Sequence, residues 1–312
     1  MTIVLTLLGH GCPPQAIVAA YGLDERTVAA WRDRAGRHGR HFHEHRVLSG
    51  QVELGHVQAD ELSVKAVAGR VWMAMAMAVP SRLRLGGAVS PKRDLALILA
   101  VVRMVRSAAR GPATPLCVDG LAGDVTAVTR VVRDPVRTGR RGRPRLVATA
   151  GLLVGQAIKH RVGRCVVGVT HRVVRGTAAA VAAVLQATGT GTGINTAYIE
   201  RLNATFRGAF SPSVRRGRAI ARGAGTLTAG MYLVGCAYNF CRAHDSLRVA
   251  APEGAGRKWR ERTPAMAAGL TDRAWTMREW PSHPIPLPPS VAPKRRGRPP
   301  KPRQAAITVP AT

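Results

Sequence analysis

Acidic residues, aromatic residues and cysteine motifs are all scarce in this chain of 312 residues. Its five cysteines form no CxxC pair, so the sequence indicates neither a zinc ribbon nor a disulfide framework. We therefore expect a reducing, cytoplasmic setting. Aromatic residues make up 4% of the chain, so Ala, Val and Leu must form most of the core. The longest apolar run, from Val71 to Pro80, is too short to span a bilayer, and no membrane partner is expected.

The shortage of acidic residues leaves a large excess of positive charge. There are 17 Asp and Glu against 47 Lys and Arg, a formal net charge of +30. Such a chain repels itself unless it meets a polyanion, so the leading partner is nucleic acid. A solvated basic surface is the simpler alternative. A membrane-surface protein would need a basic amphipathic anchor, which the sequence lacks.

Residues 1–45 predict a helix-turn-helix region. A helix follows Pro13 and Pro14, the pattern breaks at Gly22, and Asp24 is a good N-cap for a second helix. An ordinary helical hairpin is the alternative. In a helix-turn-helix, the second helix enters the major groove and would present three candidate DNA contacts: Arg26, Thr27 and Arg32. The following run, GRHGRHFHEHRV, holds four histidines and is interpreted as a solvated linker facing phosphate, with a zinc site as the alternative.

Residues 55–250 predict an α/β domain. HVQADELSVKAV, RVWMAMAMAVP and SRLRLGGAVS have the character of strands, and the second suits a central strand buried on both faces. An amphipathic helix closed by Gly111 follows, and then TPLCVDG, a short strand ending at Asp119. This order is expected of a ribonuclease-H-like mixed sheet flanked by helices.

The rest of the chain alternates between basic and helical segments. Residues 134–146 predict an exposed loop and RCVVGVTHRVV a strand, whereas a helix is expected before and another after the glycine-rich hinge at 188–193. A long helix is expected from LTAGMYLVGCAYNFCRAHDSL. Residues 280–312 are rich in Pro and basic residues and predict a disordered tail.

Three carboxylates stand among apolar neighbours: Asp60 and Asp119 in or at the end of strands, and Glu200 on a helix. Buried carboxylates are costly unless they are paired or bind a metal, and hard cations prefer oxygen ligands. If the three converge, they suit two Mg²⁺ ions for phosphoryl transfer, with Mn²⁺ as an alternative. Glu61 could take the place of Asp60, since neighbouring residues of a strand face opposite sides. Singly, Asp119 could be a turn residue and Glu200 part of a surface ion pair.

Several segments resemble the DDE transposases of bacterial insertion sequences: ADELSVK, LCVDGLAG, NTAYIERLNATFR and YNFCRAHDSL. The resemblance covers roughly residues 55–247 and implies that Asp60, Asp119 and Glu200 are the catalytic, metal-binding triad. It also implies that Asn195 and Arg201 steady Glu200 or hold DNA, and that Arg207 binds DNA. Tyr238, Asn239, Arg242 and His244 match a Tyr-Asn…Arg-Pro-His element that packs behind the site, although Ala243 stands where that element has Pro.

The tetrapeptide RGRP occurs twice, at 141–144 and at 296–299. Arg296 and Arg298 belong to KRRGRPPKP, which resembles an AT-hook, whose arginines enter a narrow minor groove. Non-specific phosphate binding by a basic tail is the alternative. Arg141 and Arg143, between Asp119 and Glu200 in the sequence, are expected to grip phosphate near the active site.

Together these features predict a DNA transposase that cuts the ends of its own element and joins them to target DNA. Because such enzymes act on two ends at once, the resemblance implies a homodimer or larger synaptic complex, located at the bacterial nucleoid. The alternatives are a hydrolytic nuclease of the same fold and a DNA-binding protein without catalysis, which is a decayed transposase or a regulator. The three acidic residues argue against the last alternative, and the abrupt start of the chain at an apolar helix argues for it.

Overall fold

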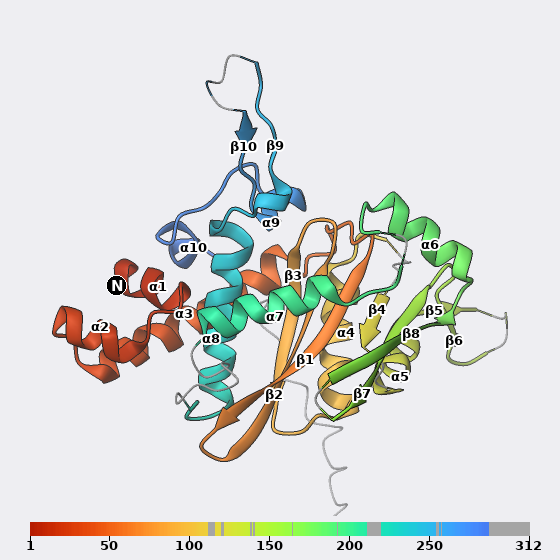
Figure 1. Cartoon of the computed structure of the whole chain (residues 1–312), viewed down its shortest axis with the longest axis horizontal. Helices are drawn as coiled ribbons and strands as arrows, with labels where there is room; N and C mark the ends of the chain where they lie inside the picture. The colour runs from red at the N-terminus through yellow and green to blue at the C-terminus, as the bar shows by residue number, and fades with distance from the viewer. Residues whose placement is uncertain are drawn as a thin grey trace, which may run out of the picture.

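The structure is a computed structural model of mixed α/β type, with helices on both faces of a central sheet (Figure 1). It describes residues 1–111, 116–119, 122–137, 139, 141–163, 165–191, 193–210, 220–253, 256 and 258–286, without the side chains of 116–119, 122 and 124.

The central sheet has six strands in the order β3-β2-β1-β4-β7-β8. β1, β2 and β3 form an antiparallel meander, β4 and β7 then run parallel to β1, and β8 returns antiparallel to β7. The strands span Val57–Ala66 (β1), Gly69–Ala78 (β2), Leu83–Ser90 (β3), Leu116–Asp119 (β4), Val154–Val162 (β7) and Cys165–Arg175 (β8). The predictions of β1 to β4 and β8 are confirmed. Met73 to Ala78 are buried between the two helical layers, as a central strand requires.

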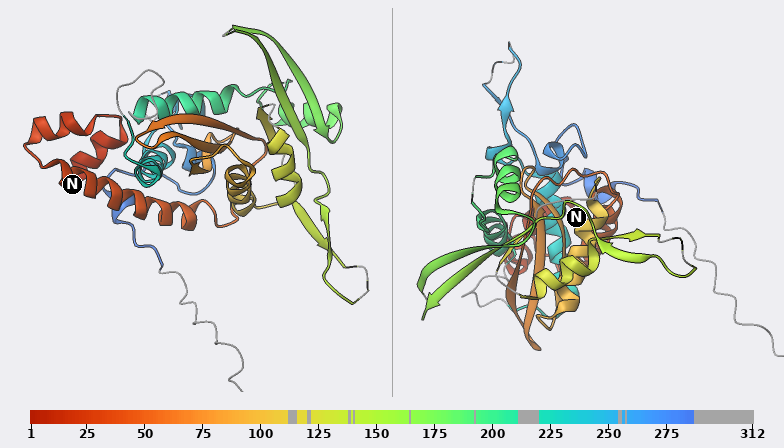
Figure 2. Two further views of the ribbon diagram at one scale, coloured as in Figure 1. Left: turned by 90° about the horizontal axis from the view of Figure 1, so that it is seen from below. Right: turned by 90° about the vertical axis from the view of Figure 1, so that its right-hand side faces the viewer.

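Helices cover both faces of the sheet. Apolar residues of α4 pack with α3 and Ala76 of β2 on one face, whereas α7 packs on the methionines of β2 on the other. α8 lies beside β3 and contacts α3 (Figure 2). The helices span Leu95–Ala108 (α4), Ala122–Val131 (α5), Ala178–Ala187 (α6), Ala197–Ala209 (α7) and Ala224–Cys236 (α8), which continues as a π-helical turn over Ala237–Cys241. The predicted α4 is confirmed but ends three residues before Gly111.

Three helices precede the sheet: α1 (Thr2–Gly9), α2 (Pro14–Tyr21) and α3 (Glu25–Arg46). The predicted break and cap are confirmed. Gly22 ends α2 with a left-handed φ of 61°, and the Asp24 carboxylate accepts hydrogen bonds from the backbone amides of Arg26 (2.8 Å) and Thr27 (3.2 Å). The helices therefore form as the local sequence predicts. Their action as a DNA-binding helix-turn-helix stays a prediction.

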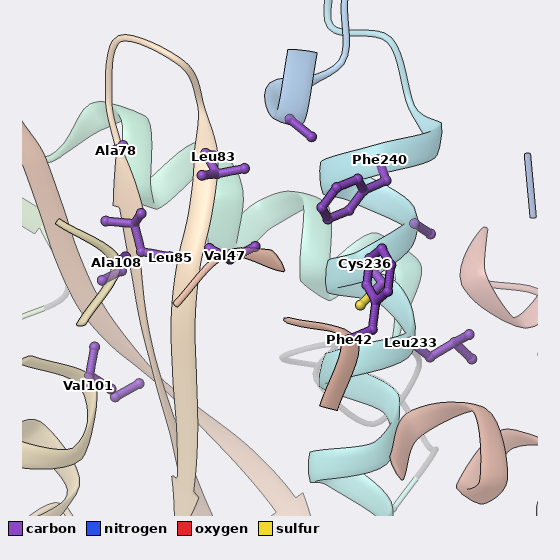
Figure 3. Packing of buried hydrophobic residues seen from close by; sticks show 14 of the residues in the cluster. Phe42, Val47, Ala78, Leu83, Leu85, Val101, Ala108, Leu233, Cys236 and Phe240 are labelled. Carbon is purple, nitrogen blue, oxygen red and sulfur yellow. The ribbon is translucent and has the colours of Figure 1, made fainter. Parts of the chain in front are cut away.

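The histidine-rich run is not a linker, because α3 continues through it to Arg46. Phe42 is fully buried, with its ring centroid 4.9 Å from that of Phe240, and Figure 3 shows it beside Cys236. His43 is also buried, and its Nε2 lies 3.1 Å from the carbonyl oxygen of Leu85. Burial, and then the charge of Arg84, holds the pKa of His43 well below its usual value. Phe42 and His43 are therefore buried residues of the core. The basic composition of the run had indicated a solvated segment instead.

Two further predictions, a loop at 134–146 and a tail from residue 280, are wrong. Residues 134–146 are not simply a loop, because β5 (Arg133–Val136) pairs with β6 (Arg145–Ala148) in an exposed hairpin. The tail does not begin at 280, since Trp280 is fully buried within α10 (Glu279–Ser282) and joins the same core as Val4. Residues 287–312, with the second RGRP copy, lie outside the described residues. The remaining short elements are a 3₁₀ turn (Asp245–Leu247), β9 (Val249–Ala250), β10 (Trp259–Arg260) and α9 (Pro264–Ala267).

No helix among the described residues is both long and apolar enough to cross a membrane.

Candidate functional site

A cavity of about 720 Å³ opens where β1, β7 and α7 come together. Its wall combines acidic, basic and amide side chains from these three elements and from β2, β8 and the segment before α4. The lining residues are Asp60, Glu61, Leu62, Ser63, Trp72, Arg93, Lys159, Arg161, Val166, Glu200, Asn203 and Arg207. Two of the three predicted carboxylates, Asp60 and Glu200, therefore share one cavity.

Asp60 is held from two directions. It lies in β1 opposite Met75 of β2, and its carboxylate accepts hydrogen bonds from Asn203 Nδ2 (2.7 Å) and from the backbone amide of Glu61 (2.8 Å). Asn203 is 1% exposed, and its Oδ1 is a buried oxygen with no hydrogen-bond donor. Carboxylate oxygens such as those of Asp60 are the donors that a hard cation prefers, and Asn203 holds this carboxylate in place.

Glu61 is engaged elsewhere. Its side chain, only 6% exposed, forms a 2.8 Å ion pair with Arg93, whose guanidinium lies 5.0 Å from the Trp72 ring centroid. We expected only one of Asp60 and Glu61 to face the site, yet both line the cavity. The last β1 residue paired with β4 is Ala59, so on that side no described strand pairs with Asp60 and Glu61, the two residues that follow.

Asp119 ends β4, and only its backbone is described. Val118 pairs with Ala59, so Asp60 and Asp119 are the next residues along two neighbouring parallel strands. Asp119 itself pairs with Ala157 of β7. The backbone thus brings Asp119 to the level of Asp60 at the carboxyl end of its strand.

Glu200 stands in the first turn of α7 and is bound by cationic and hydroxyl donors. Its carboxylate forms an ion pair with Lys159 Nζ and accepts a 2.8 Å hydrogen bond from Thr196 Oγ1. Burial raises the pKa of Glu200, but hydrogen bonds from Lys159 and Thr196, together with the charges of Lys159 and Arg161, outweigh it and lower the pKa. Glu200 is therefore a carboxylate held in its charged form.

One buried glutamine fixes α7 against the sheet. The Oε1 of Gln58 accepts hydrogen bonds from the backbone amides of Tyr198 (3.1 Å) and Ile199 (3.0 Å), and its Nε2 donates to the carbonyl of Asn195 (2.8 Å). Because Gln58 and Asp60 are two residues apart in β1, the same strand that carries Asp60 also sets the position of Glu200. The side chain of Asn195 completes this junction: its Oδ1 accepts from the Ala197 amide at 3.2 Å.

The other predicted DNA contacts are dispersed. Arg207 lines the cavity, whereas Arg201 lines a second cavity on another side of α7. Arg26 and Thr27 lie in the first turn of α3, and Arg32 farther along it forms a 2.9 Å ion pair with Asp33. Arg141 and Arg143 are in the connection of the β5–β6 hairpin, which extends away from α7 in Figure 2. They were expected near the active site but do not line the cavity. Arg296 and Arg298 are outside the described residues.

Sequence reasoning missed Lys159, Arg161, Asn203 and Gln58. β7 was not predicted, because VGQAIKHRV mixes polar and apolar residues without clear alternation. Nothing in the sequence therefore places its lysine and arginine on a strand of the central sheet. Asn203 could have been found, since it follows Glu200 by three residues and shares its side of a helix. Among the residues whose side chains are described, no three His, Cys, Asp or Glu gather as a metal-binding group.

A comparison of the sequence with models of known protein families and with curated proteins found no match.

Proposed function

We propose that the protein is a DNA transposase of an insertion sequence, with a ribonuclease-H-like core that cuts the ends of its element and joins them to target DNA. The observation that carries this proposal is the shared cavity of Asp60 and Glu200, with the backbone of Asp119 ending the strand next to Asp60. Two-metal phosphodiester chemistry uses carboxylates to hold the ions, and basic residues around them attract the polyanionic substrate.

The order of the sheet supports the proposed core. Three antiparallel strands, a helix and two parallel strands give β3-β2-β1-β4-β7, with the carboxylates at the central strands β1 and β4 and the third on α7. Ligands of open α/β sheets bind beyond the carboxyl ends of parallel strands. Asp119 stands at such an end.

The donor set of the cavity suits Mg²⁺, or Mn²⁺ as the alternative. Asp60, Asp119 and Glu200 would hold the ions. When bound, two such ions activate the attacking oxygen and stabilise the leaving oxygen of an in-line displacement at phosphorus. Asn203 orients Asp60, and Thr196 and Lys159 keep Glu200 ionised.

Basic residues around the carboxylates would hold the DNA strand. Lys159, Arg161 and Arg207 line the same cavity and supply positive charge where phosphates would lie. The net charge of +30 favours association with DNA. Because a transposase cuts and joins two DNA ends at once, the proposal implies a homodimer or larger assembly at the nucleoid.

The test is a Mg²⁺-dependent strand-transfer assay with labelled ends of the DNA element that encodes the protein. Glu200→Gln keeps the shape of the side chain and removes its charge, so joining should fall to background while DNA binding persists. Glu53→Gln is the matched control, because Glu53 is exposed and does not line the cavity. Joining by wild type and Glu53→Gln, but not by Glu200→Gln, supports the proposal. DNA binding by all three with joining by none favours a catalytically inactive DNA-binding protein.

A further inference from the structure

A second cavity, of about 430 Å³, lies on another side of α7. It is formed by the turn between β2 and β3, by α7 and by the segment that follows the π-helical turn. Six side chains define its chemistry: Arg82, Tyr198, Arg201, Tyr238, Arg242 and His244. We call this cavity the arginine pocket. Arg82 and His244, two of its lining residues, are 162 positions apart in the sequence.

The arginine pocket is positively charged. Three arginines line it against one carboxylate, that of Asp245. Burial, followed by the charges of Arg82 and Arg201, lowers the pKa of His244, so His244 is neutral near pH 7. Burial raises the pKa of Tyr238 to about 12, so this phenol adds no negative charge. The pocket is therefore suited to an anion.

The arginine pocket also has an aromatic and apolar wall. The guanidinium of Arg82 lies 4.0 Å from the ring centroid of Tyr198, and Met77 and Leu202 line the same space. Arg82 adopts a left-handed φ of 57°, and its Nε donates to Ser246 Oγ at 3.5 Å. Tyrosine rings and guanidinium planes are the surfaces on which proteins stack nucleic-acid bases.

The size of the arginine pocket exceeds that of a phosphate ion. Pockets for small organic molecules measure about 300–1,000 Å³, and this one falls within that range. One nucleotide combines the two chemistries that the wall offers, an anionic phosphate and a flat base.

α7 links the arginine pocket to the carboxylate cavity. Tyr198, Arg201, Leu202 and Thr205 face the arginine pocket, whereas Glu200, Asn203 and Arg207 face the carboxylate cavity. These spacings of three, four and seven residues place two neighbouring stripes on one helix. A strand crossing α7 can reach both cavities.

We propose that the arginine pocket binds one unpaired nucleotide of the DNA strand, its phosphate on the arginines and its base against Tyr198 and Leu202. The assignment of DNA as the source of that nucleotide rests on the proposed function. It predicts that an unpaired nucleotide next to a duplex increases affinity, because a base in a stacked duplex cannot enter a pocket of this kind.

The experiment compares binding of two DNAs in EDTA, which removes any contribution from metal-dependent cutting. One is a blunt duplex, and the other is the same duplex with a short unpaired 3′ tail whose first base is 2-aminopurine. Wild type should bind the tailed DNA about tenfold more tightly and quench its fluorescence. Arg201→Ala and Tyr198→Leu should each lose the preference and the quenching; Arg201→Ala should also bind both DNAs more weakly, because it removes a positive charge. Arg103→Ala, an exposed arginine of α4, is the matched control.

The outcomes separate this inference from the proposed function. If Arg201→Ala and Tyr198→Leu both retain the preference and the quenching, or if wild type shows none, the pocket does not bind an unpaired nucleotide. Displacement of the tail by inorganic phosphate as readily as by a deoxynucleoside monophosphate would equally overturn the nucleotide assignment. Loss of the preference in the two variants supports it, even where the strand-transfer assay with Glu200→Gln fails to support a transposase.

Discussion

The contact between α3 and α8 predicts that replacing glycine by alanine destabilises the protein at Gly36, whereas the same substitution is tolerated at Gly208 in α7. A Cβ added to Gly36 of α3 would lie 2.4 Å from the Cα and 2.5 Å from the carbonyl oxygen of Ala229 in α8. Real Cβ atoms do not come so near to backbone, so one helix must move. A Cβ added to Gly208, an exposed residue of α7, meets nothing within 4 Å.

The expected magnitudes follow from two terms. Replacing glycine by alanine within a helix favours the helix by about 1 kcal/mol. Overpacking a buried contact costs about 1–3 kcal/mol, and the upper end applies to Gly36, because backbone cannot turn aside as a flexible side chain can. Gly36→Ala should therefore lower the free energy of unfolding by about 2 kcal/mol. Gly208→Ala should leave it unchanged or raise it by up to about 1 kcal/mol.

Urea unfolding followed by circular dichroism measures both variants. The midpoint should fall for Gly36→Ala and not for Gly208→Ala, with unchanged slopes, since the slope follows the surface exposed on unfolding. A Gly36→Ala protein as stable as wild type would refute the reasoning. It would mean that α3 does not lie against α8 through Gly36, and that the histidine-rich run is not held in the core as described.

Three other measurements test the core and the carboxylate cavity. Phe42→Ala should lower the free energy of unfolding by about 3–5 kcal/mol in the same urea assay, whereas a solvated histidine-rich segment would tolerate the change. Burial, and then the charge of Arg82, lowers the pKa of His56 to about 4 from an ordinary 6.5. As the pH falls below 6.5, His56 takes up a proton in the unfolded chain before it does so in the folded protein. The free energy of unfolding should therefore fall by about 3 kcal/mol between pH 6.5 and pH 4. His56→Gln should flatten that slope, and an unchanged slope would contradict the assignment. Lys159→Met should raise the pKa of Glu200, because the side chain stays buried and the neighbouring positive charge is lost. A ¹³C NMR titration with labelled glutamate measures this pKa, and an unchanged or lower value would contradict the prediction.

The carboxylate cavity was only partly predictable from sequence. Asp60, Asp119 and Glu200 could be chosen because acidic residues are rare in this chain and these three interrupt apolar segments. Their cationic neighbours could not be chosen in the same way. Lysines and arginines number 47, so nothing in the sequence distinguishes Lys159 from the others until β7 brings it to Glu200.

Local sequence decided where most elements begin and end. Asp24 and Asp94 cap their helices through side-chain hydrogen bonds to nearby amides, and Gly22 permits the left-handed turn that ends α2. Such signals act within a few residues, so they can be interpreted without knowledge of the rest of the fold. The meander of β1 to β3 followed from apolar segments separated by short turns in the same way.

Tertiary structure decided what lies next to what. The histidine-rich run looked like a solvated linker because its composition is basic, yet Gly36 and Gly39 allow α8 so near that Phe42 and His43 become buried. The two cavities on either side of α7 depend on Gln58, which ties that helix to β1 across 140 residues of sequence. The sequence by itself determined the capped helices, the strands β1 to β4 and β8, and the rare carboxylates, because each depends on neighbours along the chain. Only the fold decided which cations meet Glu200 and which arginines share a pocket, because those contacts arise from burial and packing between distant segments.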